Sequence, residues 1–282
     1  MAINGRTDLA CEVHRRLCDG ASVTELPGVR AREETVDSFP VTTVEILDAR
    51  GEEALGKPCG LYLTLELPPR LSDCFPAAAR ALSRLILRCA GQIPDRVLLA
   101  ALGNPDITPD AVGSLAASHL LVTEHLKQRD PETFAPFRAT TLCRPGVLGT
   151  SGLESARQIR ALCREARPGL VIAIDALAGA ELPMLCRSVQ VCNTGIAPGS
   201  GVGNAREALT AGSLGLPVLA IGVPTVADAS ALSPEEELRG MFVTPRSIDS
   251  MVRGCSHLIA AGINLALHPT VPFEELELLT SS

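Results

Sequence analysis

The sequence predicts an α/β fold, in which a sheet is flanked by helices within one domain. Short β-branched and Leu runs bounded by turn residues alternate with longer amphipathic segments, which is the pattern of this fold class. The chain has 282 residues, of which 46% are hydrophobic and 20% are charged, so it can bury a core of its own. With no Trp, one Tyr and six Phe, that core is aliphatic.

Six short apolar runs are predicted to be strands, because their continuous apolar character is typical of the interior of a sheet. In chain order they are residues 43–47, 61–67, 97–102, 170–174, 188–192 and 218–221. Five segments with apolar residues at helical spacing are predicted to be helices. They are residues 77–90, 110–127, 153–165, 205–211 and 247–267.

The first 40 residues are polar and rich in arginine, and they indicate an N-terminal extension. Residues 41–282 are then expected to form a single α/β domain, because no internal repeat or low-complexity segment divides them. An uncharged stretch at 208–227 has about the ~20 residues that a membrane span needs. Its three Gly and two Pro instead indicate a helix end, a turn and a buried strand.

Charge and cysteine content narrow the possible functions. The chain carries 32 acidic and 25 basic residues and few aromatic ones, which disfavours direct binding of nucleic acid. Ten cysteines without a C-x-x-C motif, and an N-terminus without an apolar signal region, indicate reduced thiols in a cytoplasmic protein. No HExxH or G-x-S-x-G motif is present, so we expect no cofactor, no zinc site and no serine nucleophile.

One candidate site residue follows a predicted strand directly. The run VIAID ends on Asp175, at the carboxyl end of a strand, where open α/β sheets build their clefts. Asp175 is therefore a candidate catalytic residue. The alternative is that its carboxylate caps the next turn.

A second acid follows the strand predicted at 97–102. In LGNPDITPDAVG, Thr108 as N-cap, Pro109 at the first helical position and Asp110 in the first turn also describe an ordinary helix start. If the two strands are parallel neighbours, however, Asp110 and Asp175 meet at one cleft. Two facing carboxylates can share a proton, so that one acts as a base on water and the other as an acid.

A glycine-rich loop at 193–209, NTGIAPGSGVGNAREAL, is the third candidate. Such a loop lets the backbone approach a ligand and aims N–H groups at it, although its spacing fits neither a dinucleotide fingerprint nor a P-loop. A tight turn between strand and helix is the alternative. The residues that we expect to bind substrate are Asn193, Gly199, Ser200, Gly201, Gly203 and Asn204.

Six motifs in order along the chain resemble the germination protease (spore protease) family of endospore-forming bacteria, and together they cover nearly the whole chain. They are RTDLACE at 6–12, VEILDARGEEALGKPCGLYLTLELP at 44–68, LGNPDITPDAVG at 102–113, VIAIDALA at 171–178, NTGIAPGSGVGNAREAL at 193–209 and GLPVLAIGVPTVADA at 215–229.

The resemblance implies an endopeptidase that degrades small acid-soluble spore proteins during germination, through an atypical pair of acids that falls on Asp110 and Asp175. It also implies a phosphorylase/hydrolase-like three-layer sandwich with a mixed, mostly parallel sheet. The protein is then expected to be a cytoplasmic homotetramer of the spore core, made as a zymogen. Its partners would be the spore proteins, with neither nucleic acid nor membrane bound directly.

The resemblance further implies that the family's substrates are cut after an acid and before an apolar residue. The sequence Thr7-Asp8-Leu9-Ala10 fits that pattern. We therefore predict that a short leader, residues 1–8, is removed by cleavage between Asp8 and Leu9, in a flexible extension where proteolysis is easy.

Three departures from the family pattern leave other functions open. Ala180 stands where the family carries Lys or Arg, Asn193 stands where it carries Asp, and the segment at 229–243 is shorter. A cation beside a carboxylate pair favours the ionised form, and Arg187 or Arg206 could replace the missing one. The alternatives are a metal-dependent maturation-type peptidase with Glu66 or Asp175 as ligands, and a catalytically inactive binding homologue.

Overall fold

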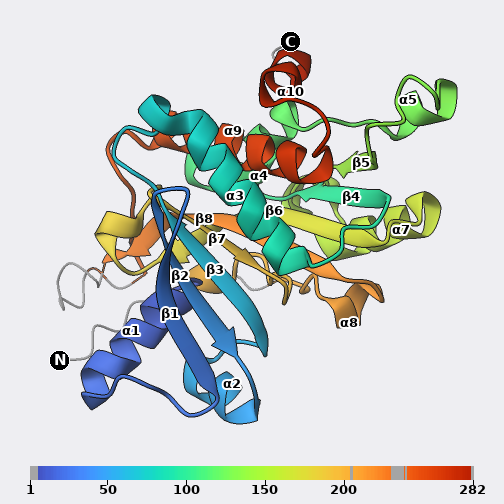
Figure 1. The fold of residues 1–282 in the computed structure, drawn as a ribbon. Coiled ribbons are helices and arrows are strands. Elements are labelled where there is room, and N and C mark those ends of the chain that lie inside the picture. Colours follow the sequence, from blue (N-terminus) through green and yellow to red (C-terminus); the bar gives the residue numbers. More distant parts are fainter. Residues whose placement is uncertain (1–5, 204–205, 230–237, 239, 281–282) are drawn as a thin grey trace.

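The computed structural model describes residues 6–203, 206–229, 238 and 240–280, and a nine-stranded sheet runs through it (Figure 1). The strands are β1 (Val29–Val36), β2 (Phe39–Ile46), β3 (Gly60–Glu66), β4 (Arg96–Ala101), β5 (Ala139–Cys143), β6 (Leu170–Gly179), β7 (Ser188–Cys192), β8 (Val218–Asp228) and β9 (Phe242–Val243). Their spatial order is β1-β2-β3-β7-β8-β6-β4-β5, with β9 beside β8. All six predicted strands are present.

The sheet has a parallel half and an antiparallel half. Strands β5, β4, β6 and β8 pair in parallel, whereas β1, β2, β3 and β7 pair antiparallel and join the other half through β7 and β8. The predicted mixed α/β sheet is confirmed. Among the described strands, parallel pairing is confined to these four, so it does not dominate the sheet as expected.

Helices cover both faces of the sheet (Figure 1). They are α1 (Ala10–Ala21), α2 (Ala49–Leu55), α3 (Phe75–Ala90), α4 (Val112–Ala116), α5 (Glu124–Arg129), α6 (Leu148–Ser151), α7 (Ser155–Ala166), α8 (Ala211–Leu214), α9 (Ile248–Leu267) and α10 (Phe273–Thr280). Alternation along the strands builds a core on each face. In β4, Leu99 packs into the cluster with α3 and α9, and Leu98 packs into the cluster with α7.

The segment expected as an N-terminal extension contributes two elements to this fold. Helix α1 packs on β2 and β3, where Leu9 and Ala10 are fully buried. Strand β1 is an edge strand that pairs with β2 through a turn at Asp37 and Ser38, both with positive φ. Arg and Glu side chains on β1 explain why the segment looked like an extension, because edge strands often carry charge.

The helix predicted at 110–127 is wrong, because the chain leaves the helix twice. Helix α4 ends at Ala116, a 3₁₀ turn follows, and residues 120–123 are not helical before α5 begins. The side chain of Asn264, only 1% exposed on α9, satisfies the backbone at this break. Its Nδ2 donates to the His119 carbonyl at 2.8 Å, and its Oδ1 accepts from the Leu121 N–H at 3.1 Å.

The helix predicted at 205–211 is also wrong over its described residues. Residues 206–210 are not helical, and Leu209 instead forms a β-bridge with Ile196. Helix α8 begins only at Ala211, where Thr210 and Ser213 form a reciprocal capping box. The bridge ties the glycine-rich loop back onto itself, which helical hydrogen bonding would prevent.

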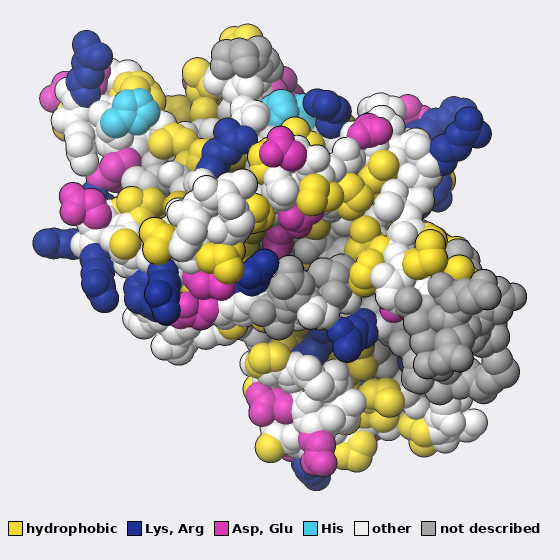
Figure 2. All heavy atoms as spheres, turned by 180° about the vertical axis from the view of Figure 1, so that it is seen from behind, with side chains coloured by type: hydrophobic (Ala, Val, Ile, Leu, Met, Phe, Trp, Pro, Cys, Tyr) yellow, Lys and Arg dark blue, Asp and Glu magenta, His cyan; other side chains and the backbone are white. Residues whose placement is uncertain are grey.

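None of the described helices combines the length and apolar character that crossing a membrane requires. On the face seen in Figure 2, acidic, basic and hydrophobic side chains are interspersed. Such a mixed surface differs from the basic stripe that nucleic-acid-binding domains present.

We expect Asn264→Ala to lower the free energy of unfolding by about 2 to 3 kcal/mol, because it leaves a buried N–H and a buried carbonyl unpaired. Urea denaturation followed by circular dichroism measures the change. The control is Gln128→Ala on the exposed face of α5, which should cost less than about 0.5 kcal/mol. Equal losses in the two variants would contradict this account of the helix break.

Candidate active site

The parallel pairing of β4 with β6 fixes the position of the two candidate acids. The register pairs Val97 with Leu170 and Ala101 with Ile174. Strand β4 therefore ends beside Ile174, whereas β6 continues to Gly179. The expectation that these strands are neighbours is confirmed. Asp175 was expected at the end of its strand but lies inside β6, paired with Gly222 of β8. Asp110 lies in the 3₁₀ turn Thr108–Asp110 that follows β4.

Close backbone approaches bring the turn with Asp110 onto the strand ends. Gly103 has a φ of 93°, and a Cβ there would lie 1.9 Å from the carbonyl oxygen of Asp110. A Cβ at Gly113 would lie 2.4 Å from the Leu102 carbonyl oxygen and 2.5 Å from that of Ile174. These two positions need glycine because the turn and α4 rest directly on the backbone of β4 and β6.

Thr108 does not cap a helix as predicted. Its hydroxyl donates to Asp249 on α9 at 2.9 Å, and Ile107 occupies the position before the turn without a capping hydrogen bond. On the other side, the Thr225 hydroxyl of β8 donates to the Pro109 carbonyl at 2.7 Å. The turn is therefore held by α9 and β8 rather than by its own first residue.

Asp110 and Asp175 line one cavity of about 550 Å³, which we call the acid cavity. Asp175 is 4% exposed, and its Oδ1 accepts from the Ala176 N–H at 3.0 Å. Burial raises the pKa of Asp175 well above its ordinary value, and the nearby charge of Asp110 adds to the effect. Burial also raises the pKa of Asp110, which accepts an opposing hydrogen bond from the Asn104 N–H at 2.9 Å.

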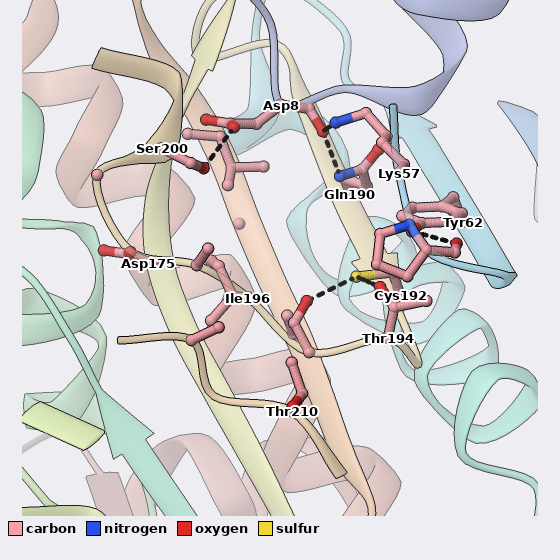
Figure 3. A pocket seen from close by; sticks show the side chains of 18 of the residues that line it. Asp8, Lys57, Tyr62, Asp175, Gln190, Cys192, Thr194, Ile196, Ser200 and Thr210 are labelled. Atoms are coloured by element: carbon pink, nitrogen blue, oxygen red, sulfur yellow. Dashed lines mark hydrogen bonds between the residues drawn. The ribbon is translucent and has the colours of Figure 1, made fainter. Parts of the chain in front are cut away.

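A second, smaller cavity of about 270 Å³ adjoins the first, and we call it the lysine cavity (Figure 3). Lys57, Tyr62, Gln190 and Cys192 line it. Asp8, Asp175, Leu177 and Gly199 line both cavities, so the two are parts of one cleft. Lys57 and Gln190 could not be predicted from the sequence, because a single Lys in a turn and a single Gln in a strand match no motif.

The glycine-rich loop meets the N-terminal segment in this cleft. Ser200 lines the lysine cavity, and Gly201 lines the acid cavity. A Cβ at Gly201 would lie 2.2 Å from Oδ2 of Asp8, and one at Gly203 would lie 2.6 Å from a guanidinium nitrogen of Arg6. The loop therefore lies against the side chains of Arg6 and Asp8 in the chain's own N-terminal segment.

Two of the predicted substrate-binding residues, Asn193 and Gly203, line neither cavity of the described cleft. Asn193 lines neither cavity, and its Oδ1 accepts from the Leu61 N–H at 2.9 Å, next to the ladder between β3 and β7. Its role in the structure is to join two strands. Asn204 lies outside the described residues.

The N-terminal segment is anchored by a buried carboxylate. Glu12 is fully buried, and it accepts hydrogen bonds from the N–H groups of Ala180 at 2.8 Å and Glu181 at 3.0 Å. At the position where the family pattern has Lys or Arg, this chain has Ala180, whose N–H instead binds the carboxylate of Glu12. Of the two proposed replacements, Arg206 lines the acid cavity, whereas Arg187 is exposed and lines neither cavity.

Other chemistries receive no support from the described side chains. Among residues 6–203, 206–229, 238 and 240–280, no three His, Cys, Asp or Glu are grouped to hold a metal ion. Glu66, the other proposed ligand, lines neither cavity. Burial raises the pKa of the Cys192 thiol, which disfavours the nucleophilic thiolate at neutral pH.

Comparisons with known proteins agree on one family. A family model described as germination protease matches residues 6–237. The chain is 38% identical to a germination protease of Caldanaerobacter subterraneus subsp. tengcongensis, with 97% of each chain covered. It is 35% identical to one from Clostridium perfringens, covering 97% of this chain and 98% of the relative, and 31% identical to one from Bacillus cereus, covering 93% of each.

We expect Gly113→Ala to lower the free energy of unfolding by about 1 to 3 kcal/mol, because a methyl group would force α4 away from the backbone of Leu102 and Ile174. Chemical denaturation measures the loss. Gly20→Ala in α1 is the matched control, since a Cβ there meets nothing within 4 Å. That control should be neutral or stabilising by up to about 1 kcal/mol, and a Gly113→Ala variant as stable as the control would refute the close approach.

The stability of the protein should depend on the charge of Asp175. Because the pKa of Asp175 is raised in the folded state, folding favours its protonated form. The resulting decrease in the free energy of unfolding is absent below about pH 4, the ordinary aspartate pKa. The decrease grows as the pH rises through the raised pKa. We expect Asp175→Asn to raise the melting temperature at pH 7.5, with the gain disappearing near pH 4. A variant no more stable than the wild type at pH 7.5 would contradict this.

Proposed function

Because the chain belongs to the germination protease family, a family of endopeptidases, we propose that it hydrolyses peptide bonds with Asp110 and Asp175 as an acid pair. The observation that carries the proposal is the burial of Asp175 beside Asp110 on one cavity. Two carboxyls in that setting hold one proton between them, so the pair contains an acid and a base at once.

The environments of the two acids favour one division of roles. Asp175 is the more deeply buried, so it keeps the proton, whereas Asp110 is half-buried and accepts an N–H hydrogen bond that stabilises its charge. Asp110 then removes a proton from water, whose oxygen attacks the carbonyl carbon. Asp175 donates its proton to the leaving amine as the C–N bond breaks.

The relatives are germination proteases, which supports a role in spore germination, and we propose small acid-soluble spore proteins as the substrates. Assembly as a homotetramer, synthesis as a zymogen and a location in the spore core accompany this proposal. Cleavage between Asp8 and Leu9 stays a prediction, although Asp8 lies within the cleft rather than on a free tail.

We expect Asp110→Asn and Asp175→Asn each to slow cleavage of a purified acid-soluble spore protein by at least about 10²- to 10⁴-fold, because each removes one member of the proton-sharing pair. Mass spectrometry of the products over time measures the rate. Asp95→Asn, on a fully exposed acid, is the matched control and should keep the wild-type rate. Near-full turnover by either variant of the pair would exclude the acid-pair mechanism.

The same assay separates the alternatives. A metal-dependent peptidase would lose activity when a chelator is added, whereas the acid pair would not. A cysteine enzyme would be inhibited by alkylation of its thiols. If the wild-type chain binds the spore protein without cutting it, the chain is a binding homologue.

A further inference from the structure

Asp8 enters the cleft from the N-terminal segment, and every polar group on it has a partner (Figure 3). Its N–H donates to the Ala178 carbonyl at 2.9 Å. Its carboxylate accepts from the Ala178 N–H at 2.8 Å and from the Ser200 hydroxyl at 3.1 Å. Its carbonyl oxygen accepts from Nζ of Lys57 at 2.9 Å and from Nε2 of Gln190 at 3.1 Å. The cleft therefore binds both the main chain and the acidic side chain of one residue.

The ammonium group of Lys57 donates hydrogen bonds to backbone carbonyls. Besides the Asp8 carbonyl, it donates to the Thr7 carbonyl at 3.4 Å. Within the described part of the chain, Lys57 forms no ion pair with a carboxylate. A partly buried ammonium group without a carboxylate partner favours negative charge on the oxygen that it contacts.

Gln190 contacts the main chain on both sides of Leu9. The side chain is 5% exposed on β7, its Nε2 donates to the Asp8 carbonyl, and its Oε1 accepts from the Ala10 N–H at 2.8 Å. One side chain thus fixes the direction and register of the bound segment. Together with Lys57 it places two donors at 2.9 and 3.1 Å from one carbonyl oxygen, which is the arrangement that stabilises an oxyanion.

The burial of the N-terminal segment changes between Asp8 and Leu9. Leu9, Ala10 and Cys11 are buried in the core, whereas Asp8 lines both cavities. The contacts of Asp8 are polar, and open space of the acid cavity, with Asp175 on its wall, lies beside them. Asp8 therefore lies at the boundary between the buried core and the open cavity.

We propose that Lys57, Gln190, Ser200 and the Ala178 N–H form the recognition site for an acidic residue of a peptide substrate, and that Asp8 stands in for that residue. Lys57 and Gln190 bind its carbonyl oxygen, while Ser200 and Ala178 bind its carboxylate. This inference rests on the proposed function and assigns the residues that give it specificity. As the water oxygen adds to the carbonyl carbon, the C=O electron pair moves to the oxygen, where Lys57 and Gln190 stabilise it.

The test compares two peptides cleaved by the full-length chain: one with the sequence of residues 5–14, GRTDLACEVH, and one with Asn in place of its Asp. We expect the wild type to prefer the acidic peptide, and Ser200→Ala to reduce that preference in kcat/KM by about 10-fold. Lys57→Met should lower kcat for both peptides by about 10²-fold and leave the preference unchanged.

Lys127→Met is the matched control for the lysine. Lys127 also donates to two backbone carbonyls, those of Phe134 at 3.0 Å and Phe137 at 2.5 Å, but it lies outside both cavities of the cleft. The Lys127→Met variant should lose about as much thermal stability as Lys57→Met does, and it should keep the wild-type kcat. Equal kcat values in the Lys57 and Lys127 variants, or an unchanged preference in Ser200→Ala, would overturn the assignment.

A binding measurement separates this inference from the proposed function. Full-length Asp175→Asn is titrated against both peptides carrying a fluorescent label, and anisotropy reports the affinity. We expect tighter binding of the acidic peptide, a preference lost with Ser200→Ala, and a further gain in affinity with Asp8→Ala, which removes the competing carboxylate. If the wild type cuts neither peptide but the binding preference holds, only the proposed function fails. Without that preference, the recognition site is wrong.

Discussion

The register between β4 and β6 is the constraint on which the rest of the site depends. It ends β4 beside the middle of β6, so that Asp175 is buried within β6 and Asp110, in the turn after β4, lines the same cavity. A carboxylate taken out of water is costly, and the aliphatic core on both faces of the sheet has to offset that cost. The same burial gives the pair its affinity for a proton, so stability and chemistry oppose each other at Asp175.

Both halves of the sheet contribute residues to the cleft. Strand β8 pairs in parallel with β6 and antiparallel with β7, so it joins the acids of one half to Gln190 of the other. Lys57 comes from the turn between α2 and β3 in the antiparallel half. The N-terminal segment and the glycine-rich loop lie across this junction, which is why a residue as early in the chain as Asp8 meets residues near position 200.

The features predicted from sequence were those that neighbouring residues determine. Apolar runs located the strands, and an acid after each of two runs located the pair. The features missed depend on distant partners: the helix at 110–127 is interrupted by Asn264 from α9. Asn193 looked like part of a binding loop, yet its partner is Leu61 on another strand. Nothing local in the first 40 residues showed that Glu12 binds the backbone at Ala180.

The hydrogen bonds of the N-terminal segment also bear on the order in which the protein assembles. The bond between Ala10 and Gln190 joins residues 180 positions apart, and that between Asp8 and Ala178 spans 170. Contacts between such distant positions form late, because a long loop must close first. During translation, residues 8–10 leave the ribosome long before β7 exists to receive them. A nascent chain therefore has no complete cleft, and the segment synthesised early docks only on a nearly finished sheet.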